Sequence, residues 1–229
     1  MSSSLLAFGC FVLTVILYLI SKWLYRKKRI VLFMPLLLAP ILILIVVLAL
    51  KIPYQDYIQD SHWLLWMLGP ATVAFAIPIY DQRKLIAKHW LSLSVGVCVA
   101  VFVAVFSSVM LARVFHLSVE LQRSLAMRSI TTPFAIQATK IIGGQTDLNA
   151  VFVVITGVLG MAIGEFTLTL TAIRSRLGKG ASLGACAHGA GTAKAYQLGH
   201  TEGVTSSVIM MLAGVITVCA APLIGHVFW

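Results

Sequence analysis

Long uncharged apolar runs alternate with short charged stretches along this chain of 229 residues. Five runs approach or exceed the roughly 20 residues with which a helix spans a bilayer. They are Leu5 to Ile20, Ile30 to Leu50, Trp90 to Ala112, Leu148 to Ile173 and Val204 to Trp229. A sixth run, Trp63 to Tyr80, is shorter and contains Gly69, Pro70 and Pro78, which a membrane helix tolerates when neighbours cover its freed backbone groups. The pattern predicts an all-α integral membrane protein with about six full transmembrane helices.

The composition agrees with this fold class. Hydrophobic residues make up 60% of the chain and charged residues 10%, and the mean hydropathy of +0.99 lies outside the range of soluble globular domains. No linker or low-complexity tract is visible, so we expect one transmembrane domain over residues 1–229. The first apolar run is followed by "SKWLYRKKR" without a small-residue cleavage site, which favours a retained anchor over a signal peptide.

The net charge of +10 arises from Lys and Arg clusters in short loops, at residues 22–29, 83–88 and 174–179. Such clusters are typical of the cytoplasmic loops of membrane proteins, so the charge indicates contact with a lipid bilayer and not with nucleic acid. Placing the clusters inside puts the N-terminus outside. No transit peptide is visible, and we expect a multi-pass membrane protein.

The stretch "RSITTPFAIQATKIIGG", residues 128–144, is too polar and too interrupted for an ordinary transmembrane helix. The run before it ends outside, and the run after it must begin outside to end at the cluster near Arg174. Residues 113–147 therefore start and finish on one side. We expect an amphipathic interfacial helix in "RVFHLSVELQRSLAM", followed by a segment that enters and leaves the membrane from one face.

A second stretch of this kind is "GASLGACAHGAGTAKAYQLG", residues 180–199. The two stretches align at an offset of 60 residues around Thr132 and Thr192, and Gly157 in the following run aligns with Gly214. The pattern suggests an internal repeat, as in many transporters. If residues 180–199 are re-entrant, the repeat is inverted; if they cross the membrane, it is parallel. The loop charges do not choose between these alternatives.

Ionisable groups at membrane depth are costly and therefore indicate function. Arg128 and Lys194 flank the two broken stretches, close to Thr131, Thr132 and Thr192. Cations, hydroxyls and backbone N–H groups freed at a helix break would together bind a small anion. The alternative for Arg128 is an interfacial residue whose side chain reaches the headgroups.

Two further groups could carry a proton. His188 precedes Gly189 near the second break, and it could contact substrate, carry a coupling proton or serve as a hydrogen-bonded structural residue. Glu165 could be a proton site, although its position near the end of its run favours a side chain that reaches the interface.

The remaining motifs suggest packing. Gly160 and Gly164 form a G-x-x-x-G pattern, preceded by Gly157, which is typical of a close helix–helix contact. The four cysteines, Cys10, Cys98, Cys186 and Cys219, are scattered in apolar surroundings, so we expect small core residues and neither disulfides nor metal ligands. No enzyme motif is present, and we expect no cofactor.

The chain resembles the LrgB/CidB family of bacterial membrane proteins. The resemblance rests on seven stretches in the family's order: "GPATVAFAIPIYDQ", "RSITTPFAIQ", "IIGG", "VFVVITGVLGMAIG", "GACAHGAGTAKAYQLG", "EGVTSS" and "AAPL". It implies that Thr131, Thr132, Pro133, His188, Gly191 and Thr192 occupy motif positions. Four positions depart from the usual pattern: Arg128 replaces Lys, Lys194 replaces Arg, Ala187 replaces a Ser before the motif histidine, and Met34 stands before Pro35 where the family often has Asn.

The resemblance implies two functions from different classes. Bacterial members are described as holin- or antiholin-like effectors of murein hydrolase activity and lysis, acting with a small LrgA/CidA-type membrane partner. A plastid relative exchanges glycolate for glycerate, and some bacterial pairs are linked to pyruvate uptake. Our leading hypothesis is a secondary transporter or facilitator of small monocarboxylates, which forms homo-oligomers and holds the carboxylate between the broken stretches. The alternative is a holin-like regulator of lysis.

Overall fold

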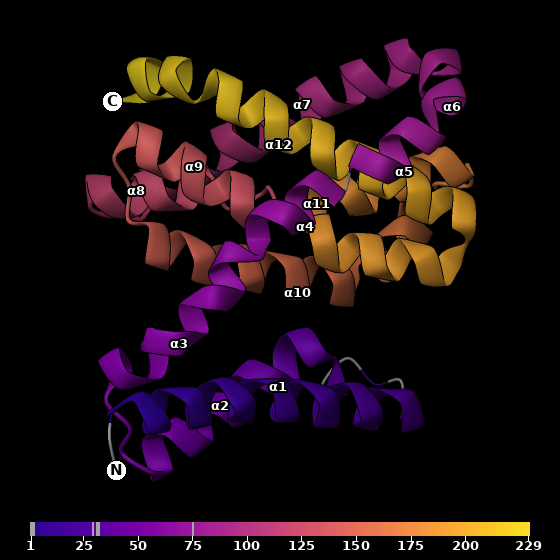
Figure 1. Cartoon of the computed structure of the whole chain (residues 1–229). Coiled ribbons are helices and arrows are strands. Elements are labelled where there is room, and N and C mark those ends of the chain that lie inside the picture. Colours follow the sequence, from indigo (N-terminus) through magenta and orange to yellow (C-terminus); the bar gives the residue numbers. More distant parts are fainter. Residues whose placement is uncertain (1–2, 29, 31–32, 75) are drawn as a thin grey trace. The chain divides into compact units, whose positions relative to one another are not determined.

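The computed structural model describes residues 3–28, 30, 33–74 and 76–229, and within these ranges every regular element is a helix (Figure 1). The helices are α1 (Ser3–Lys27), α2 (Pro35–Ala49), α3 (Tyr54–Trp66), α4 (Leu68–Ala74), α5 (Ala76–Asp81), α6 (Arg83–Lys88), α7 (Trp90–Val114), α8 (Val119–Ala126), α9 (Thr132–Ile142), α10 (Thr146–Leu170), α11 (Arg176–Leu198) and α12 (His200–Phe228). The predicted all-α class is confirmed.

Four of the described helices are long and apolar enough to cross a bilayer: Leu6–Lys27 of α1, and α7, α10 and α12. The predicted run Ile30 to Leu50 forms α2, whose 15 residues begin at Pro35, a residue suited to the first turn of a helix. The predicted run Trp63 to Tyr80 is divided among α3, α4 and α5. The helical pattern breaks at Met67, between α3 and α4, where Pro70 cannot donate to the carbonyl of Trp66. Residue 75, between α4 and α5, lies outside the described residues.

The chain forms two compact units, Met1–Ala71 and Thr72–Trp229, and the boundary falls inside α4. In the first unit α1 packs against both α2 and α3, and the hydroxyls of Thr14 and Tyr57 lie 3.0 Å apart in a hydrogen bond between α1 and α3. The division does not decide the prediction of one transmembrane domain, which stays a prediction. The candidate site lies in the second unit.

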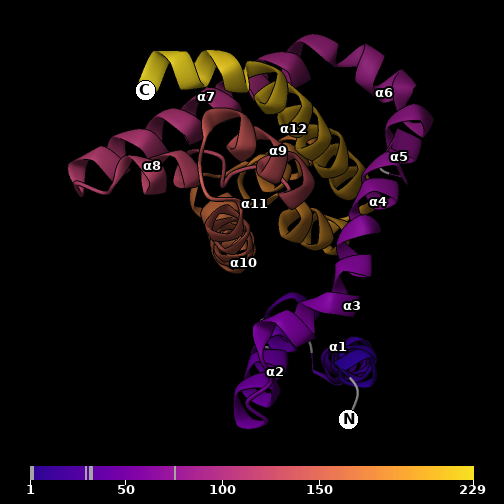
Figure 2. The ribbon, with the colours of Figure 1, turned by 60° about the vertical axis from the view of Figure 1, so that its left-hand side comes forward.

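In the second unit α7 and α12 run in the same direction and α10 runs in the opposite direction (Figures 1 and 2). The end of α7 meets the end of α12, where Arg113 donates a hydrogen bond to the carbonyl of Phe228. The start of α12 is its most buried part, with nearly every residue from Glu202 to Met211 in the core. This half of α12 is the central helix of the unit.

Helices α8 and α9 form a first helical hairpin, which we call hairpin 1 (residues 119–142). Its first arm lies beside the start of α10, where the Asn149 amide donates to the carbonyl of Ser124 over 2.9 Å. Its second arm returns beside α12, with Phe134 against Gly214 and Ile142 against Gly225. Since α10 and α12 run in opposite directions, the two arms do as well. Hairpin 1 therefore enters and leaves at the same end of the unit, as the charge pattern predicts.

Helix α11 is also a hairpin, which we call hairpin 2, because its backbone reverses at His188, with φ 36° and ψ −118°. The first arm runs in the same direction as α12, since Gly180 contacts Thr205 and Gly184 contacts Ser206. The second arm runs in the opposite direction, since Tyr196 packs on Gly203. Both ends of α11 thus lie at the start of α12, and residues 180–199 do not cross from one end of the unit to the other.

Hairpins 1 and 2 enter from opposite ends and are followed by α10 and α12, which are antiparallel. This is the arrangement expected of an inverted repeat, and it selects the re-entrant alternative for residues 180–199. The packing of the aligned glycines is reciprocal. Gly157 of α10 lies against His188 of hairpin 2, and Gly214 of α12 lies against Phe134 of hairpin 1. Each hairpin is thus packed against the long helix of the other repeat.

Candidate functional site

The tips of the two hairpins meet in the middle of the second unit. The ring of His188, at the tip of hairpin 2, lies close to the backbone of Arg128, at the tip of hairpin 1. Nη1 of Arg128 donates to the hydroxyl of Thr156 on α10 over 3.2 Å. Gly157 provides the space for the imidazole, because a Cβ there would lie 3.0 Å from Cε1 of His188. We call Arg128, Thr156, Gly157 and His188 the tip junction.

His188, in the tip junction, has an unusual backbone conformation with a positive φ. A positive φ at a residue other than glycine costs about 1–3 kcal/mol, and the buried Nε2 of His188 has no hydrogen-bond partner among the described residues. Gly189 and Gly191 follow it, and Gly191 lies directly against the backbone of Leu183, where no side chain would fit. The turn therefore depends on close approach of its two arms at Gly191, while the imidazole fills the space between the tips.

A cavity of ≈500 Å³ opens beside the tip junction. Arg128 and Ser129 line it from hairpin 1, Ser182 and Cys186 line it from hairpin 2, and small or apolar residues of α7 form much of the remaining wall. The thiol of Cys186 lies within electrostatic range of the Arg128 guanidinium. Arg128 is the only ionisable cation in this wall among the described residues. A cation held at a helical break and facing a cavity is suited to bind an anion.

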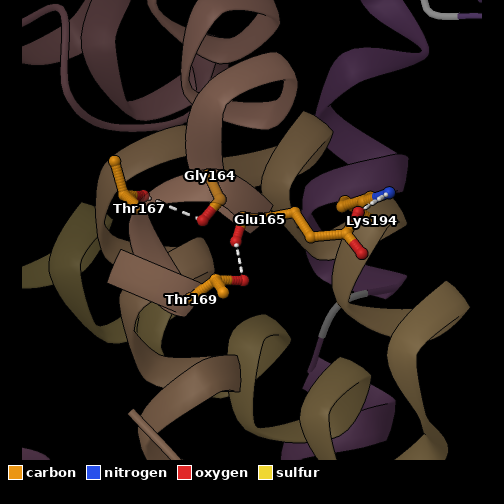
Figure 3. A network of polar contacts seen from close by, with 5 residues as sticks. All are labelled: Gly164, Glu165, Thr167, Thr169 and Lys194. Atoms are coloured by element: carbon orange, nitrogen blue, oxygen red, sulfur yellow. Dashed lines mark hydrogen bonds and ion pairs between the residues drawn. The ribbon is translucent and has the colours of Figure 1, made fainter. Parts of the chain in front are cut away.

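Lys194 does not take part in this site. Its Nζ lies 2.6 Å from Oε2 of Glu165 on α10, in an ion pair that joins the second arm of hairpin 2 to α10 (Figure 3). The side chain of Glu165 is 58% exposed and that of Lys194 is 23% exposed. The main-chain carbonyls of Gly164 and Glu165 in this turn accept from the hydroxyls of Thr167 and Thr169. The two predicted cations therefore have different partners.

The threonines of the two motifs lie at the start of a helix or in the core. Thr131 is the residue before α9 and Thr132 its first residue, with Pro133 next, and both hydroxyl-bearing side chains are half-buried. Thr192 is buried, with its hydroxyl 2.9 Å from that of Ser206 on α12. Of the residues predicted to bind substrate, Arg128 alone lines the cavity within the described chain.

The three packing glycines face hairpin 2. A Cβ at Gly160 would lie 2.7 Å from Cβ of Ala187, and one at Gly164 would lie 2.8 Å from Cδ2 of Leu183. Together with Gly157 against His188, these contacts seat the first arm of hairpin 2 on α10 along its length. The G-x-x-x-G face is therefore occupied within the chain itself.

The sequence did not point to several residues of the site. Cys186 was expected in the core, but it is exposed and lines the cavity, as Ser129 and Ser182 also do. Cys98 and Cys219 are exposed as well, and among the four cysteines only Cys10 is buried. The spacing of Gly96, Ala100 and Ala104 on α7, one small residue per turn, could have indicated the cavity wall.

Comparison with known proteins adds a family to this geometry. The sequence model of the LrgB-like family matches residues 14–227. The chain is 40% identical over 210 residues to YwbG of Bacillus subtilis (strain 168), and the aligned region covers 92% of this chain and 93% of that protein. It is 31% identical over 220 residues to the holin-like protein CidB of Staphylococcus epidermidis (95% of each), and 30% identical over 204 residues to the antiholin-like protein LrgB of Bacillus subtilis (89% and 88%). No solved structure matches it.

Proposed function

Because this chain belongs to the LrgB-like family, we propose that it serves as a holin- or antiholin-like protein in a bacterial cytoplasmic membrane. The names of the CidB and LrgB relatives support this cellular role, and both relatives match this chain over most of their length. The four long apolar helices support a multi-pass membrane protein. Regulation of murein hydrolase activity and association with a small LrgA/CidA-type membrane partner belong to the same proposal.

At the molecular level, we propose that the protein moves small monocarboxylates, of the class of glycolate, glycerate and pyruvate, across that membrane. One observation carries the proposal: Arg128 lies at the point where two re-entrant hairpins from opposite ends meet, and it faces a cavity. A guanidinium at membrane depth is costly unless it has an anionic or polar partner. Among the described residues its side chain donates to the neutral hydroxyl of Thr156, which leaves further donors for a carboxylate.

The names of the relatives favour the lysis role, whereas the carboxylate activity is supported by the geometry alone. The two proposals are compatible, since a flux of carboxylic acid changes internal pH and energetics and can thereby alter lysis. A pore assembled through the G-x-x-x-G face has less support. In this structure Gly160 and Gly164 contact hairpin 2 of the same chain and leave that face covered.

The transport proposal is tested with proteoliposomes that contain the full chain, with and without the small membrane partner. We expect uptake of labelled glycolate or pyruvate, and we expect Arg128→Gln to reduce it tenfold or more, because the variant loses a charge-assisted contact. Arg176→Gln is the control, since Arg176 is an exposed arginine at the start of hairpin 2 and lies outside the wall of the cavity.

Leakage of a large dye from the same vesicles separates the alternatives. Dye release by the wild type that persists in Arg128→Gln, with no saturable uptake of any acid, would favour a holin-like pore and reject the transport proposal. Saturable uptake without dye release supports it.

A further inference from the structure

The cavity beside Arg128 is polar at one end and apolar along the rest of its length. Arg128, Ser129 and Cys186 lie where the hairpin tips meet, whereas Val99, Val103 and Ile209 are among the residues that form its apolar wall. The hydroxyl of Ser182 already donates to the carbonyl of Gly178 in its own helix. The wall therefore offers an anion one cationic partner and offers the remainder of the ligand an apolar surface.

The lining residues on α7 and α11 show in which direction the apolar part of the cavity extends. Residues next to Arg128 in hairpin 1, Met127 and Ile130, pack near Ala104 and Val105 of α7. Gly96 lies two helical turns before Ala104, so the cavity continues along α7 beyond the tip of hairpin 1. On α11 the wall runs from Cys186 back to Ala181, away from the turn at His188. Both helices place the apolar end toward the base of hairpin 2.

The size of the cavity exceeds what a two-carbon acid would fill. Its ≈500 Å³ lies within the range of about 300–1,000 Å³ that encloses much larger ligands. A hydroxy acid would also place its hydroxyl against an apolar wall, which is unfavourable without a hydrogen-bond partner. An alkyl tail would instead gain from burial, and each added methylene would strengthen binding about fourfold until the wall ends.

We propose that this cavity prefers monocarboxylates with an unbranched apolar tail of about four to six carbons, since the wall from Cys186 to Ala181 spans about 7–8 Å of helix. The carboxylate lies at Arg128 and the tail points along α7 toward Gly96. This inference rests on the proposed carboxylate site at Arg128, and within that site it ranks acids with apolar tails above glycolate, glycerate and pyruvate, which bind through the carboxylate alone.

Gly96 allows a test that does not disturb packing, because a Cβ at this position would have no atom within 4 Å. Gly96→Leu should fill the far end of the cavity and leave Arg128 free. Gly9→Leu, in α1, is the matched control, since a Cβ there is equally unobstructed. Either substitution also removes a glycine from a helix interior, where it is unfavourable.

Binding can be read from the thiol of Cys186 in purified full-length protein whose other cysteines are replaced by serine. Acetate, glycolate, butyrate and hexanoate are titrated against its modification by an anionic methanethiosulfonate. We expect protection to strengthen about fourfold per methylene from acetate to hexanoate, with glycolate no better than acetate. Gly96→Leu should weaken hexanoate at least tenfold and leave acetate within twofold, whereas Gly9→Leu should match the wild type.

The outcomes separate this inference from the proposed function. Equal protection by acetate and hexanoate, or equal weakening of both acids in Gly96→Leu, would overturn the preference for apolar tails while the carboxylate site stands. Hexan-1-ol that protects as well as hexanoate, or hexanoate binding that survives Arg128→Gln, would reject the carboxylate site itself.

Discussion

At the scale of single residues, the two cations of the broken stretches, Arg128 and Lys194, have different surroundings. Arg128 has a neutral partner, Thr156, and faces a cavity, whereas Lys194 is neutralised by Glu165. The sequence predicts that both cations lie at membrane depth, because an isolated Lys or Arg in an apolar run is evident. It does not predict the pairing, since residues 165 and 194 become neighbours only when hairpin 2 folds back on α10.

The ion pair yields a prediction about stability. Lys194→Gln leaves the largely exposed Glu165 carboxylate unpaired, and we expect the free energy of unfolding to fall by about 0.2–1 kcal/mol, as for an exposed ion pair. The double variant Glu165→Gln/Lys194→Gln should lie closer to the wild type than either single variant, because no charge is left alone. Denaturation of the purified protein in lipid measures both, with the exchanged pair Glu165→Lys/Lys194→Glu as control. Additive losses would show that the pair contributes nothing by its charge.

At the scale of elements, the sequence identified the two hairpin stretches as irregular but did not show where their backbones reverse. Pro133 and Gly143 bound α9 closely, at its second residue and at its left-handed C-cap, so the limits of hairpin 1 could be predicted. In hairpin 2 the many glycines indicated a break, but the backbone reverses at His188 and not at a glycine, although positive φ is uncommon for any other residue. The contact with Arg128 that helps to hold it there comes from a residue remote in sequence.

The seating of hairpin 2 on α10 depends on small residues, and this can be tested. Gly160→Leu would force a side chain into Ala187, whose Cβ would lie 2.7 Å from the new Cβ. We expect a loss of about 1–3 kcal/mol in the free energy of unfolding. Gly96→Leu, where the space is open, should change it little. Equal effects of the two substitutions would mean that hairpin 2 is not seated on this face.

At the scale of the whole molecule, the apolar runs predicted α7, α10 and α12 closely, because a long uncharged run has few alternatives to a helix in a bilayer. They did not predict the break at Met67 between α3 and α4, since the effect of Pro70 depends on the neighbours that pack there. The choice between an inverted and a parallel repeat also required structure. No Lys or Arg follows Lys194 to report the side on which α12 ends.

The orientation of the second unit is a further prediction. The clusters at residues 83–88 and 174–179 both lie at the end where α7 and α12 begin, so that end should face the cytoplasm. In a cysteine-free background, an impermeant thiol reagent should label Asp147→Cys in intact cells and should label Thr201→Cys only after permeabilisation. Labelling of both from outside would mean that residues 176–198 cross the membrane.

The contact between Arg128 and His188 has a consequence for biosynthesis. The tip of hairpin 1 is made 60 residues before the tip of hairpin 2, by the difference of their numbers. At about 5–20 residues per second of translation, roughly 3–12 s pass in which Arg128 lies in or near the bilayer without that contact. During that interval the nascent chain contains α7, α8 and α9, but the tip of hairpin 2 is not yet present. The centre of this protein can therefore assemble only after the tip of hairpin 2 has been synthesised.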